Sequence, residues 1–201
     1  MKLSAVLLAG GESRRMGRDK ATIIVAGSPL WWRQIQLLQQ LDPIEILVSA
    51  RSDPTWRPTD TRFVGDEAPS RGPLSGLAAA FEQMTGTHLL ALAIDLPFLT
   101  ATQLTRIKDL TGAACGVLPQ IRARSEPLAA IYPREGSPYF VRALRGDDFS
   151  LQAITRQMID AGLLRLFDVP QTQEQLYRNV NVPADLPMSA DLKQAMSDIG
   201  C

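Results

Sequence analysis

The sequence predicts an α/β protein with three layers, in which a mostly parallel sheet lies between helices on both of its faces. Short apolar runs alternate along the chain with amphipathic stretches, which is the pattern of strands joined by crossover helices. The clearest strands are apolar on both faces, as strands covered by helices on both sides should be. They are residues 3–8, 44–49 and 89–94, with weaker candidates at residues 116–119, 128–132 and 164–169.

Two of the amphipathic stretches begin with a proline in the first helical turn. Ser28 is placed to act as an N-cap ahead of Pro29, and Gly72-Pro73 opens the next helix. Apolar residues then recur at helical spacing and should cover the sheet. They are Trp31, Ile35, Leu38 and Leu41 in the first helix and Leu74, Leu77, Ala78, Phe81 and Met84 in the second.

Two further helices have polar residues at their start. Thr100 and Gln103 have the spacing of a capping box. Ser150 precedes the other helix as its N-cap, and Gly162 ends it. The apolar positions at helical spacing are Leu104, Ile107 and Leu110 in one helix and Leu151, Ile154, Met158 and Ile159 in the other.

The length of 201 residues suits a single domain, residues 1–201, that buries a core without disulfides or a structural metal. Hydrophobic residues make up 45% and charged residues 21% of the chain, which argues against disorder. The sequence shows no internal repeat or low-complexity tract that would mark a domain boundary. The polar segment of residues 51–61, which contains prolines, is expected to be a flexible surface loop.

Charge and residue content exclude several classes of function. Lys plus Arg and Asp plus Glu each number 21, so no overall field draws the protein to nucleic acid or to an anionic membrane. The apolar run at the N-terminus is too short to span a bilayer, and a signal peptide is the minor alternative to a buried strand. Two cysteines and the single His88, expected at a strand edge, support neither a disulfide framework nor a zinc site, so a metal would need oxygen ligands. These features fit a reducing cytoplasm.

The segment directly after the first strand carries the chemistry. Residues 8–20 are L-A-G-G-E-S-R-R-M-G-R-D-K, with three glycines, three arginines and a lysine. Glycines let main-chain N–H groups approach an anion, and the cationic side chains can neutralise charge on a leaving pyrophosphate. For any single arginine a solvated loop is the better interpretation, but the ordered string favours a nucleoside triphosphate site. It matches neither G-x-x-x-x-G-K-[ST] nor G-x-G-x-x-G, which argues against P-loop enzymes and dehydrogenases.

Asp95 is the metal ligand that the residues themselves indicate. It directly follows the apolar run of residues 89–94, and ligands of open α/β sheets bind at the carboxyl ends of strands. One aspartate can suffice for Mg²⁺ when a triphosphate supplies the other ligands. The alternative is an aspartate that only starts the turn before Pro97.

The string of residues 8–20 resembles the signature L-A-[GA]-G-x-S-x-R-M-G-x-x-K of nucleotidyltransferases with a glycosyltransferase-A-like, Rossmann-related fold. Within that group the chain is similar to the molybdenum cofactor guanylyltransferases, because residues 8–11 are L-A-G-G and residues 72–76 are G-P-L-S-G. Residues 95–98, D-L-P-F, resemble the family's D-x-P-F metal motif. Residues 179–185, N-V-N-V-P-A-D, are close to the family's N-x-N-T-P-x-D. The departures are Val182 in place of threonine and Arg15 as an additional arginine, and the second leaves open which arginine faces phosphate.

The resemblance implies transfer of GMP from GTP to molybdopterin, with Mg²⁺ as cofactor held by Asp95. Lys20 would hold phosphate oxygens, and Arg14 and Arg15 would contact pyrophosphate. Leu8, with the next two residues, would contact guanine and ribose through its backbone. The full set of implied nucleotide-binding residues is Leu8, Ala9, Gly10, Gly11, Lys20, Asp66, Asp95, Asn179 and Asn181. Residues 122–128 resemble a region near the acceptor side, although an exposed loop explains them equally well.

Two alternatives stay open at this point. The same chemistry could use CTP with molybdopterin, or another nucleotide with a sugar phosphate. The chain could also be a carrier that binds nucleotide or cofactor without catalysis, which the dense cationic loop makes less favoured. The resemblance further implies transient contacts with molybdoenzyme apoproteins and cofactor-insertion factors.

Overall fold

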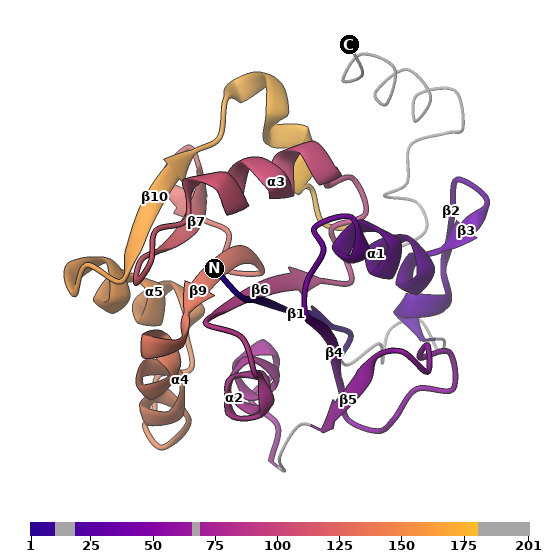
Figure 1. Cartoon of the computed structure of the whole chain (residues 1–201), viewed down its shortest axis with the longest axis horizontal. Coiled ribbons are helices and arrows are strands. Elements are labelled where there is room, and N and C mark those ends of the chain that lie inside the picture. The colour runs from indigo at the N-terminus through magenta and orange to yellow at the C-terminus, as the bar shows by residue number, and fades with distance from the viewer. Residues whose placement is uncertain (11–18, 66–68, 181–201) are drawn as a thin grey trace.

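A mixed sheet forms the centre of the protein in this computed structural model, which describes residues 1–10, 19–65 and 69–180. Within these residues the main sheet has eight strands in the order β10-β7-β9-β6-β1-β4-β5, with β8 paired to β7 (Figure 1). The strands are β1 (Leu3–Leu8), β4 (Glu45–Ala50), β5 (Arg62–Gly65), β6 (His88–Ala93), β7 (Gly116–Ile121), β8 (Arg124–Ser125), β9 (Ala129–Pro133) and β10 (Leu164–Asp168).

Most of these strands run parallel, as the sequence predicts. β1 pairs in parallel with β4 on one side and β6 on the other, and β4 continues in parallel to β5. β10 is likewise parallel to β7. The exception among the long strands is β9, which runs antiparallel to both β6 and β7. Its direction brings the start of β9 to the edge of the sheet where β1 and β6 end.

Helices cover both faces, which confirms the three-layer prediction. α1 (Leu30–Gln39) and α3 (Ala101–Leu110) lie on one face, and α2 (Pro73–Gln83), α4 (Ser137–Leu144) and α5 (Leu151–Asp160) on the other (Figure 1). Side chains of β1 alternate between the two cores, because Leu7 packs with α1 and α3 while Leu8 packs with α2. Every residue of β1 is therefore buried, which is why its sequence is apolar apart from Ser4. The Ser4 hydroxyl donates to the Glu45 carboxylate at 2.6 Å.

The predicted helix starts are confirmed at three of four positions. Gly72 caps α2 with a φ of 64°, a conformation that suits glycine, and Pro73 follows at the first turn. The Thr100 hydroxyl accepts from the backbone N–H of Gln103 at 3.3 Å, and the Ser150 hydroxyl accepts from that of Ala153 at 3.5 Å. The Gln103 side chain donates to the Tyr177 hydroxyl at 3.1 Å, so Thr100 is an N-cap without the second half of the predicted capping box. The apolar stripe of α2 is buried as expected.

The prediction for Ser28 was wrong. Ser28 and Pro29 form strand β3 (Ser28–Pro29), which pairs with β2 (Ile24–Val25), and α1 begins after Pro29 without a side-chain cap. Ala26 and Gly27 have φ values of 48° and 82°, and two residues at positive φ make the tight turn of a two-stranded hairpin. Because the chain pairs with itself here, Ser28 is held in extended form one residue too early to cap the helix.

Residues 51–61 form the predicted loop between the parallel strands β4 and β5, without helix or strand, but side-chain contacts hold it where flexibility was expected. The ring of Trp56 in this loop stacks on Trp31 of α1, with centroids 5.6 Å apart and an interplanar angle of 17°. The loop therefore lies against the α1 face of the sheet, where a crossover helix would normally pack.

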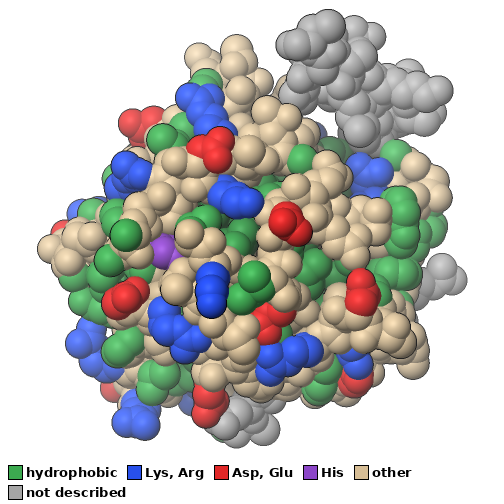
Figure 2. All heavy atoms as spheres, viewed as in Figure 1, with side chains coloured by type: hydrophobic (Ala, Val, Ile, Leu, Met, Phe, Trp, Pro, Cys, Tyr) green, Lys and Arg blue, Asp and Glu red, His purple; other side chains and the backbone are tan. Residues whose placement is uncertain are grey.

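The surface visible in Figure 2 carries lysine and arginine side chains interspersed with aspartate and glutamate, without a large patch of either sign. His88, expected at a strand edge, is the first residue of β6 and is buried. No helix in the part of the chain that the structure describes combines the length and the apolar character needed to cross a membrane.

Candidate active site

The topology of the sheet has a switch point between β1 and β6. From β1 the chain crosses through α1 to β4 and then passes to β5, and α2 returns it on the opposite face to β6, on the other side of β1. In open α/β sheets, ligands bind in the crevice that such a reversal opens at the carboxyl ends of the strands. The ends of β1 and β6 are tied together there, since the Ile94 amide donates to the Leu8 carbonyl at 3.1 Å.

The chain leaving β1 is fixed by one carbonyl group of β4. The amides of Ala9 and Gly10 both donate to the Ser49 oxygen, at 2.9 and 3.1 Å. These two donors are thus used inside the protein, and backbone contact with a nucleotide at Ala9 and Gly10 would go through their carbonyl oxygens. The arrangement brings the predicted residues Leu8, Ala9 and Gly10 to the switch point.

Helix α2 packs closely against the ends of β1 and β4 at Gly76. A Cβ atom at Gly76 would lie 2.4 Å from the Ser49 hydroxyl oxygen and 2.8 Å from a methyl carbon of Leu8. Only glycine lets the helix approach the ends of β1 and β4 this closely. The sequence G-P-L-S-G of residues 72–76 therefore has a structural role in holding the segment that follows β1.

Asp95 lies two residues beyond β6 in a turn that is fixed from two elements. The buried amide of Gln34 in α1 donates to the Leu96 carbonyl at 2.9 Å and to the Ala93 carbonyl at 3.3 Å. The Val180 amide donates to the Asp95 carbonyl at 2.9 Å. This second bond places Asn179, the residue before Val180, beside the site.

Lys20 and Asp95 meet although 75 positions separate them in the sequence. The Lys20 Nζ atom is 3.2 Å from the Asp95 Oδ2 atom, and the two side chains are 17% and 25% exposed. Lys20 is the first residue of a 3-10 turn, η2 (Lys20–Thr22), and Asp19 caps that turn by accepting from the Ala21 amide. A cation and a carboxylate therefore stand together at the switch point, partly shielded from solvent.

A second carboxyl group, that of Glu126, lies on the same edge. Ala93 of β6 donates to the Leu128 carbonyl at 2.9 Å, so the antiparallel pairing of β6 with β9 continues toward Asp95 and Glu126. Burial, and after it the negative charge of Asp95, raise the pKa of Glu126, while the Leu128 amide, which donates to Oε1 at 3.2 Å, acts in the opposite direction. The negative charge of Asp95 thus reaches the carboxyl group of Glu126.

The donor set is compatible with a hard divalent cation. Among residues 1–10, 19–65 and 69–180, no group of three or more His, Cys, Asp or Glu side chains is arranged to hold a metal ion. An all-protein zinc or calcium cage is therefore not found in this part of the chain. One or two carboxylates beside a place for phosphates is the set that Mg²⁺ uses.

The structure thus brings together part of the predicted site. Leu8, Ala9, Gly10, Lys20, Asp95 and Asn179 gather at one edge of the sheet. Gly11, Arg14, Arg15, Asp66 and Asn181 lie outside the described residues. Sequence reasoning did not single out Ser49 or Gln34, although a polar Gln34 on an otherwise apolar helix stripe was a signal that could have been used. Glu126 was expected only as part of residues 122–128, which resemble a region near the acceptor side.

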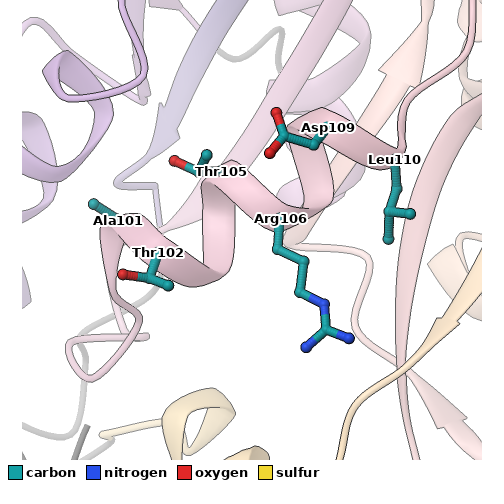
Figure 3. A pocket seen from close by; sticks show the side chains of 6 residues that line it. All are labelled: Ala101, Thr102, Thr105, Arg106, Asp109 and Leu110. Atoms are coloured by element: carbon teal, nitrogen blue, oxygen red, sulfur yellow. The ribbon is translucent and has the colours of Figure 1, made fainter. Parts of the chain in front are cut away.

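An open depression runs along the exposed side of α3 (Figure 3). Arg106, one of its lining residues, also packs over the ring of Phe167 in β10, 4.9 Å from its centroid. None of the predicted site residues lines the depression. The others that line it are Ala101, Thr102, Thr105, Asp109 and Leu110.

Comparison with known proteins agrees with this geometry. The family model described as a MobA-like NTP transferase domain matches residues 5–162. A protein of Opitutus terrae named "probable molybdenum cofactor guanylyltransferase" is 31% identical over 91% of this chain and 92% of its own length. A protein of the same name from Mycolicibacterium paratuberculosis is 33% identical over 92% of this chain and 94% of its own length.

Solved structures share the fold. The molybdopterin-guanine dinucleotide biosynthesis protein A of Archaeoglobus fulgidus superposes with a TM-score of 0.70 at 21% identity, covering 98% of this chain and 100% of that one. The 2-C-methyl-D-erythritol 4-phosphate cytidylyltransferase of Thermus thermophilus does so with a TM-score of 0.65 at 16% identity, covering 98% of both chains. The expected glycosyltransferase-A-like nucleotidyltransferase fold is confirmed.

Proposed function

Because this chain belongs to the MobA-like NTP transferase domain family and is therefore a nucleotidyltransferase, we propose that it transfers GMP from GTP to molybdopterin. The products are the guanine dinucleotide form of the cofactor and pyrophosphate. The contact between Lys20 and Asp95 at the switch point carries the proposal, because it pairs a phosphate-binding cation with a carboxylate beside the end of β1. The names of the relatives from O. terrae and M. paratuberculosis support guanylyl transfer in particular.

In the proposed reaction the terminal phosphate of molybdopterin attacks the α-phosphorus of GTP in line. A bond forms between that phosphate oxygen and the α-phosphorus, and the bond from the α-phosphorus to the bridging oxygen breaks as pyrophosphate leaves with its electron pair. The nucleophile is already an anion, so no general base is needed. The protein's task is to position the reactants and to neutralise charge.

Lys20 suits this task because its ammonium group lies on a four-carbon stem that can follow phosphate oxygens. Its place beside Asp95 keeps the charge near the predicted triphosphate position. We propose that Asp95 holds Mg²⁺, with Glu126 as a second carboxyl group on the same edge. When bound, Mg²⁺ supplies charge neutralisation on the triphosphate oxygens.

The direct test is incubation of the protein with GTP, Mg²⁺ and molybdopterin, followed by mass analysis of the product. We expect a product heavier than molybdopterin by one guanylyl group, together with pyrophosphate. The same assay with ATP, CTP and UTP, and with a sugar phosphate as acceptor, separates this reaction from its neighbours. Product with CTP alone, or with a sugar phosphate alone, would replace the proposed substrates, and binding without pyrophosphate release would indicate a carrier.

A further inference from the structure

Trp56, a residue outside the predicted site, donates a hydrogen bond to Asp19, the residue that precedes Lys20. The indole Nε1–H of Trp56 donates to Asp19 Oδ2 at 2.7 Å, across 37 positions of sequence. The Trp56 ring at the same time stacks on Trp31 in the first turn of α1. Trp56 is therefore fixed by its ring on one side and bonded by its polar atom on the other.

Asp19 uses both carboxylate oxygens. Oδ1 accepts from the Ala21 amide at 2.9 Å, while Oδ2 accepts from Trp56. The Asp19 carbonyl also accepts from the Thr22 amide at 3.0 Å and from its hydroxyl at 2.8 Å. Asp19 is exposed, and the turn that it caps begins with Lys20. The orientation of the Asp19 side chain thus bears directly on the backbone of Lys20.

The loop that carries Trp56 is braced. The Arg57 guanidinium donates to both oxygens of Asp53, from Nε at 2.7 Å and from Nη2 at 2.9 Å. The Arg57 amide donates to the Pro54 carbonyl at 3.0 Å, and Arg57 Nη1 donates to the carbonyls of Pro58 and Thr61. A planar guanidinium with this many partners holds a loop in one arrangement. The braced loop therefore holds the Trp56 indole in place as a hydrogen-bond donor to Asp19.

We propose that Trp56 is a positioning residue for triphosphate binding: through Asp19 it fixes the turn that presents Lys20 to Asp95. The inference rests on the proposed nucleotidyl transfer and adds a residue to it. Lysine has a flexible side chain, so a fixed backbone origin reduces the conformational freedom lost when the ammonium binds phosphate. A role in packing alone requires only the ring of Trp56, whereas the bond to Asp19 requires its N–H group.

The variant Trp56→Phe separates these roles, because it keeps a ring to stack on Trp31 and lacks the N–H donor. We expect the affinity for the Mg²⁺ complex of the triphosphate used by the wild type to fall about fivefold, with a rise in KM and little change in kcat. In a Lys20→Ala background the same change should weaken binding less than about twofold, because there is no longer a side chain to position. Trp32→Phe, a change at a 45% exposed tryptophan of the same helix as Trp31, is the matched control and should bind like the wild type.

Asp19→Ser tests the bond from its other end. Serine can cap the turn but cannot also accept from Trp56. We expect Asp19→Ser to weaken binding as Trp56→Phe does, and the double variant to be no weaker than either single one. The proposal would be overturned if Trp56→Phe lowered the triphosphate affinity equally in the wild-type and Lys20→Ala backgrounds, or did not lower it at all.

An NMR measurement keeps the inference testable if the protein uses none of the triphosphates. In ¹⁵N-labelled protein the indole N–H signal of Trp56, assigned by its loss in Trp56→Phe, should shift upfield in Asp19→Ser, while that of Trp32 stays in place. An unchanged Trp56 signal would refute the bond itself. A shifted signal in a protein without transferase activity would leave the bond in place and refute the proposed function.

Discussion

Replacing Gly76 by alanine should loosen the active edge of the sheet. The new Cβ atom would lie 2.4 Å from the Ser49 hydroxyl oxygen and 2.8 Å from a methyl carbon of Leu8, and both of these side chains are buried. Overpacking of this kind costs up to about 3 kcal/mol, and the better helix propensity of alanine returns about 1 kcal/mol. The net loss of about 2 kcal/mol corresponds to a midpoint lower by about 4–8 °C for a chain of this size.

Thermal and urea unfolding of Gly76→Ala measure this loss directly. Because the Ser49 carbonyl holds the amides of Ala9 and Gly10, we also expect the KM for the triphosphate to rise. Gly146→Ala is the control, since its Cβ would lie 3.7 Å from the nearest atom, and it should stay within about 0.5 kcal/mol of the wild type. A Gly76→Ala protein as stable as the wild type, or more stable, would show that helix propensity outweighs the packing and would refute the reasoning.

Three further predictions concern ionisable groups. Asp95→Asn should lower kcat/KM at limiting Mg²⁺ at least about 100-fold in the pyrophosphate assay, whereas Asp109→Asn on the outside of α3 should not. Burial lowers the pKa of His88, so the stability contributed by its neutral ring is present above pH 6.5, the ordinary pKa of histidine, and is lost as the pH falls below it. In urea unfolding, His88→Gln should therefore reduce the dependence of stability on pH in this range. Burial raises the pKa of Glu126, so the stability that its protonated carboxyl group contributes is present below pH 4.5 and is lost as the pH rises. The urea midpoint of Glu126→Gln, relative to that of the wild type, should therefore increase from acidic to alkaline pH. A difference between the two midpoints that does not change with pH would contradict this.

The long strands could be predicted from sequence because they are buried on both faces. β1 has the predicted bounds, and β4 and β6 begin and end within one residue of them. β5, with four residues, and α4, with eight, are not among the elements that the apolar pattern predicts. Short elements contain too few apolar positions to establish a period, so their pattern does not stand out from a loop.

The central contact of the site followed from strand order, since both Lys20 and Asp95 come after strands that end at one edge. The proximity of Glu126 could not be predicted in the same way. A strand that is apolar on both faces has the same composition in either direction, so the reversal of β9 is invisible in its sequence. The bond between Trp56 and Asp19 depends likewise on how a loop of irregular backbone packs, for which no periodic signal exists.

The reversal of β9 also separates the site into two parts with different freedom to vary. The parallel strands β1 and β6 reach the crevice with their last residues, Leu8 and Ala93. An insertion or deletion there therefore also displaces the crossover helix that follows the strand. β9 instead enters at the crevice, directly after the short hairpin that links β7 to β8. Insertions in that hairpin can change the shape of the crevice wall beside Asp95 while the register of the parallel strands is preserved.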